Sequence, residues 1–224
     1  MASKIILVIA AHADDEALGC GGTIARHAAE GDHVHAIFMA DGVNSRINST
    51  DDDLSRREEA ARKAHKILGL QRVEYLKFGD NRMDSVPLLK IVRALESLIC
   101  TISPQIIYTH HYGDLNLDHR ITHDAVMTAC RPFPDSTVRE IFAFEVLSST
   151  EWATPCKAPF LPNVFFDISE FLDLKLQALH EYRLEMRPFP HSRSIEHAKA
   201  LACHRGHSVG LYAAEAFMSL RQIR

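Results

Sequence analysis

The sequence lacks the features that mark secreted, membrane-spanning or nucleic-acid-binding proteins. Its five cysteines are scattered singly without a C-x-x-C pair, and their odd number argues against a disulfide framework. We therefore expect reduced thiols and a cytoplasmic protein. The formal net charge of -4 provides no basic surface, so we expect no nucleic acid among its partners.

Long hydrophobic runs are also absent. The apolar stretch KIILVIA, residues 4–10, is followed at once by polar residues, so it is too short for a signal segment or a membrane span. We interpret it as a buried strand and expect no membrane span. With 224 residues and 46% hydrophobic content, the chain can bury a sizeable core as one domain.

Short apolar runs alternate with helical patterns over residues 1–147, which predicts an α/β fold with a mainly parallel sheet and helices on both faces. Residues 148–224 begin with a segment rich in Pro, Ser and Thr and continue with two helical patterns, so we interpret them as a C-terminal cap segment within the single domain 1–224. The expected strands are 4–10, 33–40, 72–78, 105–110 and 139–146, and the expected helices of the first part are 19–30, 53–69, 86–99 and 117–131.

Histidine and carboxylate side chains cluster directly after the first expected strand. His12 and Asp15 are three residues apart, so one turn can direct both at the same point, and Asp14 faces the same cavity. In an open parallel sheet, ligands bind outside the carboxyl ends of the strands. Imidazole and carboxylate together suit zinc, and a catalytic zinc ion takes three protein ligands.

The third ligand is expected after the fourth strand, in THHYGDLNLDHR at residues 109–120. We favour His119, because it begins a helix that faces the crevice and Asp118 beside it can act in the outer shell. His110 and His111 are the alternatives.

A purely structural role for these residues is the competing interpretation. An isolated histidine is more often a core or capping residue, and carboxylates favour helix N-termini. Two such clusters at strand ends favour a metal site. The non-enzymatic alternative is a magnesium-dependent phosphoacceptor domain. It needs an aspartate after the third strand, a role that Asp80 would fill, and a lysine after the last strand, which FEVLSST at residues 144–150 does not supply.

AHADDE at residues 11–16 resembles the fingerprint of the PIG-L or LmbE-like family of zinc-dependent N-acetylglucosamine de-N-acetylases, which is A-H-P/A-D-D-E after the first strand. GDLNLDHR at residues 113–120 resembles the later D-H motif. The resemblance implies a Rossmann-like sheet, a Zn²⁺ cofactor, and hydrolysis of the N-acetyl group of a GlcNAc-type sugar or conjugate to amine and acetate. It also implies a homo-oligomer, with hexamers frequent in this branch.

Residue by residue, the resemblance implies that His12, Asp15 and His119 are the zinc ligands and that Asp14 is the general base. Many members carry H-P-D-H at the second motif, whereas residues 116–119 of this chain are N-L-D-H. Asn116 can donate a hydrogen bond to a developing oxyanion but cannot act as an acid. The acid is then Asp14, returning its proton, or a histidine such as His111 or His191.

Substrate contacts are expected from a further set of polar residues. Arg56 and Glu59 match the R-x-x-E pattern of the family, so Arg56 is assigned to the sugar; the competing interpretation is a surface salt bridge along a helix. Asp41 and His111 are further candidates for substrate binding, and His191 could reach the cavity of its own or a neighbouring subunit. The sequence leaves open whether the substrate is a GlcNAc-type sugar or another small acylated amine, such as a formamido sugar or an antibiotic.

Overall fold

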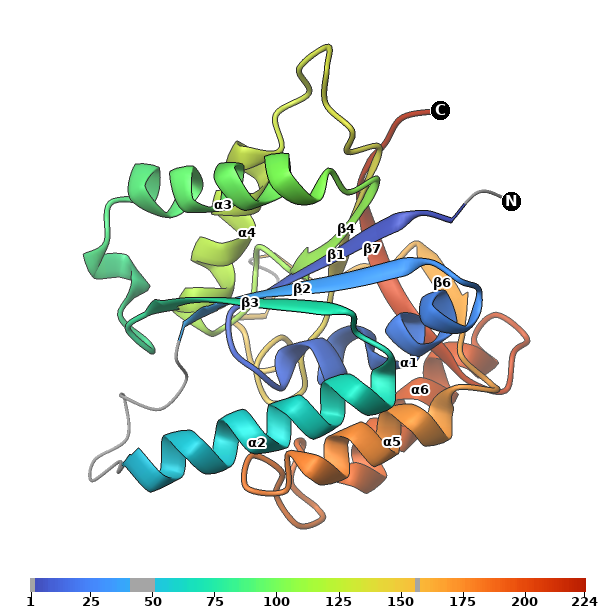
Figure 1. Ribbon diagram of the computed structural model, residues 1–224. Coiled ribbons are helices and arrows are strands. Elements are labelled where there is room, and N and C mark those ends of the chain that lie inside the picture. The colour runs from blue at the N-terminus through green and yellow to red at the C-terminus, as the bar shows by residue number, and fades with distance from the viewer. Residues whose placement is uncertain (1–2, 41–50, 156–157) are drawn as a thin grey trace.

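A mostly parallel sheet forms the centre of the molecule (Figure 1). The computed structural model describes residues 3–40, 51–155 and 158–224, and these residues form seven strands in the order β3-β2-β1-β4-β5-β7-β6. β7 is antiparallel to both of its neighbours, and the other pairings of these strands are parallel. The strands are β1 (Ile5–Ala10), β2 (His33–Ala40), β3 (Arg72–Phe78), β4 (Ile106–His110), β5 (Glu140–Phe144), β6 (Val164–Asp167) and β7 (Ala214–Gln222).

Helices cover both faces of the sheet, so the predicted fold class is confirmed. Ile6 and Val8 of β1 pack toward one helical layer, and Leu7 and Ile9 pack toward the other. This burial on both faces explains why β1 is a continuous apolar run. In Figure 1, α3 (Leu88–Ile102) and α4 (Leu117–Ala129) form one layer, and α1 (Asp15–Ala29), α2 (Asp51–Leu68), α5 (Leu172–Glu181) and α6 (Ile195–His207) form the other. No helix of the described residues combines the length and the apolarity needed to cross a membrane.

The C-terminal segment contributes to the sheet as well as to the helical layer. Both of its predicted helices are present, but β6 and β7 were not predicted from the sequence. β7 lies between β5 and β6 and pairs with both. Such pairing joins strands that are distant in the chain, so a local pattern gives little sign of it.

α1 begins at Asp15, earlier than predicted, and is broken at Cys20, where φ is -145° and ψ is 24°. Two buried side chains satisfy the backbone groups that the break leaves. Glu215 of β7 accepts hydrogen bonds from the amides of Gly22 at 3.0 Å and Thr23 at 2.7 Å. Lys175 of α5 donates to the carbonyl of Leu18 at 2.7 Å and to Glu215 at 2.5 Å. The C-terminal segment therefore holds the first turn of α1, which carries Asp15, at an angle to the rest of the helix.

Candidate metal centre and active site

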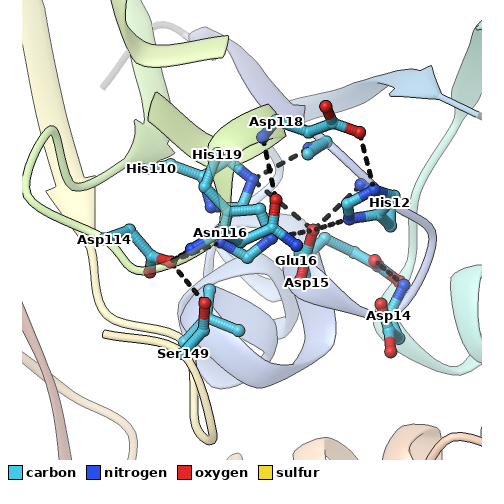
Figure 2. Close-up of polar contacts among 12 residues, drawn as sticks. His12, Asp14, Asp15, Glu16, His110, Asp114, Asn116, Asp118, His119 and Ser149 are labelled. Atoms are coloured by element: carbon cyan, nitrogen blue, oxygen red, sulfur yellow. Dashed lines mark hydrogen bonds and ion pairs between the residues drawn. The ribbon is translucent and has the colours of Figure 1, made fainter. Parts of the chain in front are cut away.

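The polar residues after β1 and after β4 meet at the carboxyl edge of the sheet, as Figure 2 shows. His12 follows β1, Asp15 begins α1, and His119 lies in the first turn of α4. Asp15 Oδ2 lies 3.3 Å from His12 Nδ1 and 3.3 Å from His119 Nε2. One donor atom from each residue lies within 4.8 Å of the others, and all three residues are buried. These three side chains can therefore hold one metal ion between them.

Each of the two histidines has a carboxylate at its other ring nitrogen. His12 Nε2 lies 3.3 Å from Asp118 and 3.1 Å from Asp80, and His119 Nδ1 lies 3.1 Å from Asp114. Carboxylates at this position fix the ring orientation and tautomer of metal-binding histidines. The donor set and its surroundings therefore fit a divalent metal ion.

Backbone and hydroxyl groups fix these outer carboxylates in turn. Asp118 accepts hydrogen bonds from the amides of Asn81 at 2.7 Å and Met83 at 3.2 Å. Asp114 accepts from the hydroxyls of Ser149 and, at 2.6 Å, Thr150. The loop after β5 thus holds Asp114 against His119 (Figure 2).

The electrostatics of the cluster favour a cation at its centre. Burial by itself would lower the pKa of His119, but Asp15 and Asp114 raise it to about 9. Burial by itself would raise the pKa of Asp15, but His119 and His12 hold it well below its ordinary value. The carboxylates of Asp15 and Asp114 therefore stabilise a positive charge between them and the histidines, and a bound metal ion would supply such a charge.

His110, one of the alternatives for the third ligand, is placed differently. Its Nε2 accepts a 2.8 Å hydrogen bond from the amide of Ala11, and its ring stacks on His119 with centroids 3.9 Å apart. Burial and His119 keep the pKa of His110 well below its ordinary value. The ring nitrogen nearest to Asp15 is therefore already engaged by the backbone.

Asp14 lies beside the metal-binding cluster in an unusual backbone conformation, with φ at 136°. Non-glycine residues rarely adopt positive φ, and such strain concentrates at functional sites. Burial raises the pKa of Asp14 to about 7, against the lowering influence of Arg193 and Arg57. A buried carboxyl group with a pKa near neutrality can both accept and return a proton.

Glu16 supports the backbone of Asp14. Its Oε2 accepts a 2.9 Å hydrogen bond from the amide of Asp14, and its Oε1 accepts one of 2.6 Å from the hydroxyl of Tyr182. His65 Nε2 lies 3.2 Å from that hydroxyl and 3.4 Å from Glu16. All of these side chains are buried. Residues of α2 and of the end of α5 are thereby tied to the turn that carries Asp14.

Two arginines reach Asp14, and neither was assigned to the site from the sequence. Arg193 Nη1 lies 2.9 Å from Asp14 Oδ2, while Arg57 Nη2 lies 3.6 Å from Asp14 Oδ1. Arg57 Nη1 also lies 2.9 Å from Glu185. Arg56, to which the sequence pattern assigns the sugar, is exposed, whereas its neighbour Arg57 is buried in the site. Arg57 lies one helical turn before Ala61 on the inward face of α2, and this spacing could have identified it.

The remaining sequence-predicted residues lie at different distances from the centre. Asn116 caps α4, because its side chain accepts a 2.8 Å hydrogen bond from the amide of Asp118, and it lines the cavity. His111 contacts the carbonyl of Ala158 at 2.8 Å, and His191 accepts from the amide of Arg193 at 2.9 Å. Neither histidine is among the described residues that line the cavity. Asp41 lies outside the described residues.

The cavity over this cluster has a volume of about 160 Å³ and a strongly polar lining. It offers carboxylates, two guanidinium groups and two amides to a small polar molecule. The described residues that line it are His12, Asp14, Asp15, Arg57, Asp80, Asn81, Asn116, His119, Glu185 and Arg193.

A mainly parallel α/β sheet with a histidine and carboxylate metal-binding cluster at its carboxyl edge defines the class of the protein. Residues 7–130 match the family model described as "PIG-L: GlcNAc-PI de-N-acetylase". The chain belongs to this family, as its sequence motifs predicted, and it is accordingly a hydrolase of the deacetylase type.

Individual proteins agree with the family assignment. The chain is 35% identical over 186 residues to the "Uncharacterized deacetylase YaiS" of Escherichia coli strain K12, covering 80% of this chain and 91% of that protein. It is 27% identical to a diacetylchitobiose deacetylase of Thermococcus kodakarensis, covering 80% and 69% respectively. Among solved structures, the conserved protein TT1542 of Thermus thermophilus superposes with a TM-score of 0.78 at 25% identity, covering 98% and 96%.

Proposed function

We propose that this chain is a zinc-dependent hydrolase that removes the N-acetyl group from a GlcNAc-type amino sugar or sugar conjugate. One observation carries the proposal: Asp14, with a pKa of about 7, borders the cluster of His12, Asp15 and His119 in one polar cavity. The family description and the T. kodakarensis relative, a diacetylchitobiose deacetylase, support an N-acetylated sugar as substrate.

In this proposal His12, Asp15 and His119 hold the metal, and Asp118 and Asp114 orient the two imidazoles. A bound zinc ion would supply Lewis-acid polarisation of a carbonyl and a water of lowered pKa, two of the three requirements of amide hydrolysis; the third is a proton for the departing amine. The donor types suit zinc, although carboxylate and imidazole also bind other divalent ions.

Asp14 carries the proton transfers. It accepts a proton from the attacking water and returns it to the departing nitrogen, so amide plus water gives amine plus acetate. Arg193 and Arg57 hold the carboxylate in place, and a pKa near 7 suits a group that must work in both directions. This assignment gives both the acid and the base role to Asp14, with no need for His111 or His191.

Asn116 takes the place of the histidine that many family members carry. Its side-chain oxygen caps α4, which leaves the amide nitrogen as a donor at the cavity wall, 3.5 Å from Asn81 Oδ1. We assign this nitrogen to the developing oxyanion, because an amide donor stabilises negative charge without transferring a proton.

The sugar hydroxyls would be bound by the polar lining that surrounds Asp14. Arg57 and Glu185 are buried there as an ion pair, and Asp80 and Asn81 face the same cavity. We therefore place Arg57, in preference to Arg56, among the substrate contacts. An acylated antibiotic or a formamido sugar uses the same centre and is the second substrate class to test.

We also propose that the chain forms a single domain and assembles as a homo-oligomer. β7 of the C-terminal segment is inserted into the sheet and Arg193 reaches Asp14, which supports one domain rather than a separate cap. A homo-oligomer, hexamers included, and a cytoplasmic location stay predictions. Sedimentation of the purified protein would give the number of subunits.

The deciding experiment measures acetate release from a panel of N-acetylated sugars, with the zinc content of the same sample determined before and after chelation. We expect release that ends on chelation, returns with zinc, and is lost in Asp14→Asn although that variant keeps its metal. Asp173→Asn, an exposed substitution on α5, is the matched control. Retained turnover in metal-loaded Asp14→Asn would contradict the assigned base, and zinc-loaded protein that is inactive on the whole panel would contradict the substrate class.

A further inference from the structure

A second cavity lies next to the polar one and differs from it in chemistry. It has a volume of about 130 Å³, and its apolar walls among the described residues come from Ala13, Ala40, Ala61 and the ring of Tyr75. Among the described residues of the lining, the charged ones are the buried Arg57 and the exposed Lys77 and Glu58. The described walls of the cavity are therefore mainly apolar, with the buried Arg57 as a charged group in the lining.

The two cavities share a wall. Arg57 lines both of them, and its Nη2 donates a 3.1 Å hydrogen bond to the carbonyl of Ala13. Ala13 itself stands between His12 and Asp14 in the sequence. The two cavities therefore lie next to each other, with the side chain of Arg57 at the wall they share.

Three small side chains, all alanines, line the apolar cavity. Ala13 lies in the turn after β1, Ala40 ends β2, and Ala61 lies on the inward face of α2. Ala13 and Ala61 belong to the same buried cluster on this face of the sheet, so we expect a larger aliphatic side chain at Ala61 to take up part of the volume. Tyr75 closes the side at β3, where its ring stacks on the buried Phe38 with centroids 5.3 Å apart.

The volume sets the size of the occupant. An apolar protein cavity of about 150 Å³ accommodates a benzene molecule. The cavity at the metal-binding cluster has a polar lining, so a plain acetylated sugar would leave the apolar cavity unused. We infer that the natural substrate carries an apolar substituent of about six carbons, which binds between Ala13, Ala40, Ala61 and Tyr75 while the acetamide or its equivalent lies at Asp14.

This inference rests on the proposed function and names the substrate class for the same site. The substituent can belong to the group linked to the sugar, as the proposed N-acetyl substrate requires, or to a larger acyl group on nitrogen, as in the second substrate class named above. Both sources offer the same chemistry to the cavity, so matched compounds are needed to distinguish them.

The test measures binding by calorimetry to zinc-loaded Asp14→Asn protein, which is expected to keep its metal and to lose turnover. Three compounds are compared: the methyl glycoside of N-acetylglucosamine, its phenyl glycoside, and the methyl glycoside with N-benzoyl in place of N-acetyl. We expect one of the two aromatic compounds to bind at least about tenfold more tightly than the methyl reference, since apolar groups in fitted pockets discriminate on that scale. The phenyl glycoside would indicate the linked group and the benzoyl compound would indicate the acyl group.

The same measurement is made on variants that fill the cavity. Ala61→Leu and the smaller change Ala61→Val on α2 are expected to abolish the preference for the aromatic compound, and either one suffices if the other does not fold. Ala60→Leu, the same change one position away and outside the described lining, is the matched control.

Equal binding of all three compounds would overturn the inference. So would a preference that survives in both folded cavity-filling variants, because the aromatic group would then bind elsewhere. Failure of the proposed function is recognised separately, because it is the absence of acetate release by zinc-loaded protein and does not depend on these affinities.

Discussion

Tyr182 and Glu16 are 166 residues apart in the sequence, and the hydroxyl of Tyr182 donates a 2.6 Å buried hydrogen bond to Glu16 Oε1. The other oxygen of Glu16 accepts from the amide of Asp14. The end of α5 is therefore connected, through one carboxylate, to the residue with the strained backbone at the site. Tyr182 and Glu16 act as positioning residues for Asp14.

Tyr182→Phe and Glu16→Gln are expected to lower kcat by roughly tenfold with little change in KM or in bound zinc, because the metal ligands keep their own supports. The control is a double-mutant cycle: in an Asp14→Asn background, neither substitution should reduce the residual rate further. A purely structural role would instead lower the rate equally in both backgrounds. His65→Gln, which keeps a polar group near Tyr182, should have the smallest effect of the three.

Asp114→Asn should weaken metal binding by about 10- to 100-fold, as loss of outer-shell carboxylates typically does. Ser149 and Thr150 donate to different oxygens of Asp114, so the amide keeps only one of these two acceptors, and it no longer supplies negative charge to His119. Competition titrations with a chelating dye would measure the affinity, and excess zinc should restore most of the activity. Asp124→Asn, an exposed change on the same helix, is the control. Unchanged zinc affinity in Asp114→Asn would contradict this role.

Gly22→Ala and Gly21→Ala make a matched pair at the break in α1. A Cβ on Gly22 would lie 2.7 Å from Ile168 Cδ1, whereas one on Gly21 would meet Lys175 Cγ at 3.4 Å. Gly22→Ala should therefore cost about 1–3 kcal/mol of unfolding free energy through overpacking. Gly21→Ala should be close to neutral or stabilising, because alanine favours helix over glycine. Urea unfolding of both variants would show the difference, and equal stabilities would refute it.

His27 should make stability depend on pH. Burial lowers the pKa of His27 despite the contact of its Nδ1 with Asp32 at 2.7 Å, so the folded state favours the neutral ring. Its contribution is complete above the unfolded pKa of about 6.5 and is lost as the pH falls below that value toward the lower pKa of the folded state. His27→Gln should reduce the fall in unfolding free energy between about pH 7 and pH 5. An identical pH dependence in the variant would exclude His27 as a contributor.

Much of the fold and part of the site could be predicted from local sequence. The apolar runs located β1 to β5, since a strand buried on both faces must be apolar throughout. The spacing of His12 and Asp15 directly after a strand indicated two side chains directed at one point. By contrast, no local pattern predicts that Arg193, Tyr182 or Glu215 contacts the site or α1. Each contacts the turn that carries Asp14 or the break in α1 from a segment far along the chain, so its role depends on the final packing of that segment.

The break in α1 also affects whether the helix can bind a nucleotide phosphate. In dinucleotide-binding folds of this layout, glycines after the first strand expose helical amides that receive a pyrophosphate. Here the amides of Gly22 and Thr23 already receive the carboxylate of Glu215, which is itself neutralised by Lys175. The chain thus supplies its own anion to the amides at the second helical start within α1, and a phosphate group would have to displace a buried side chain to bind to them.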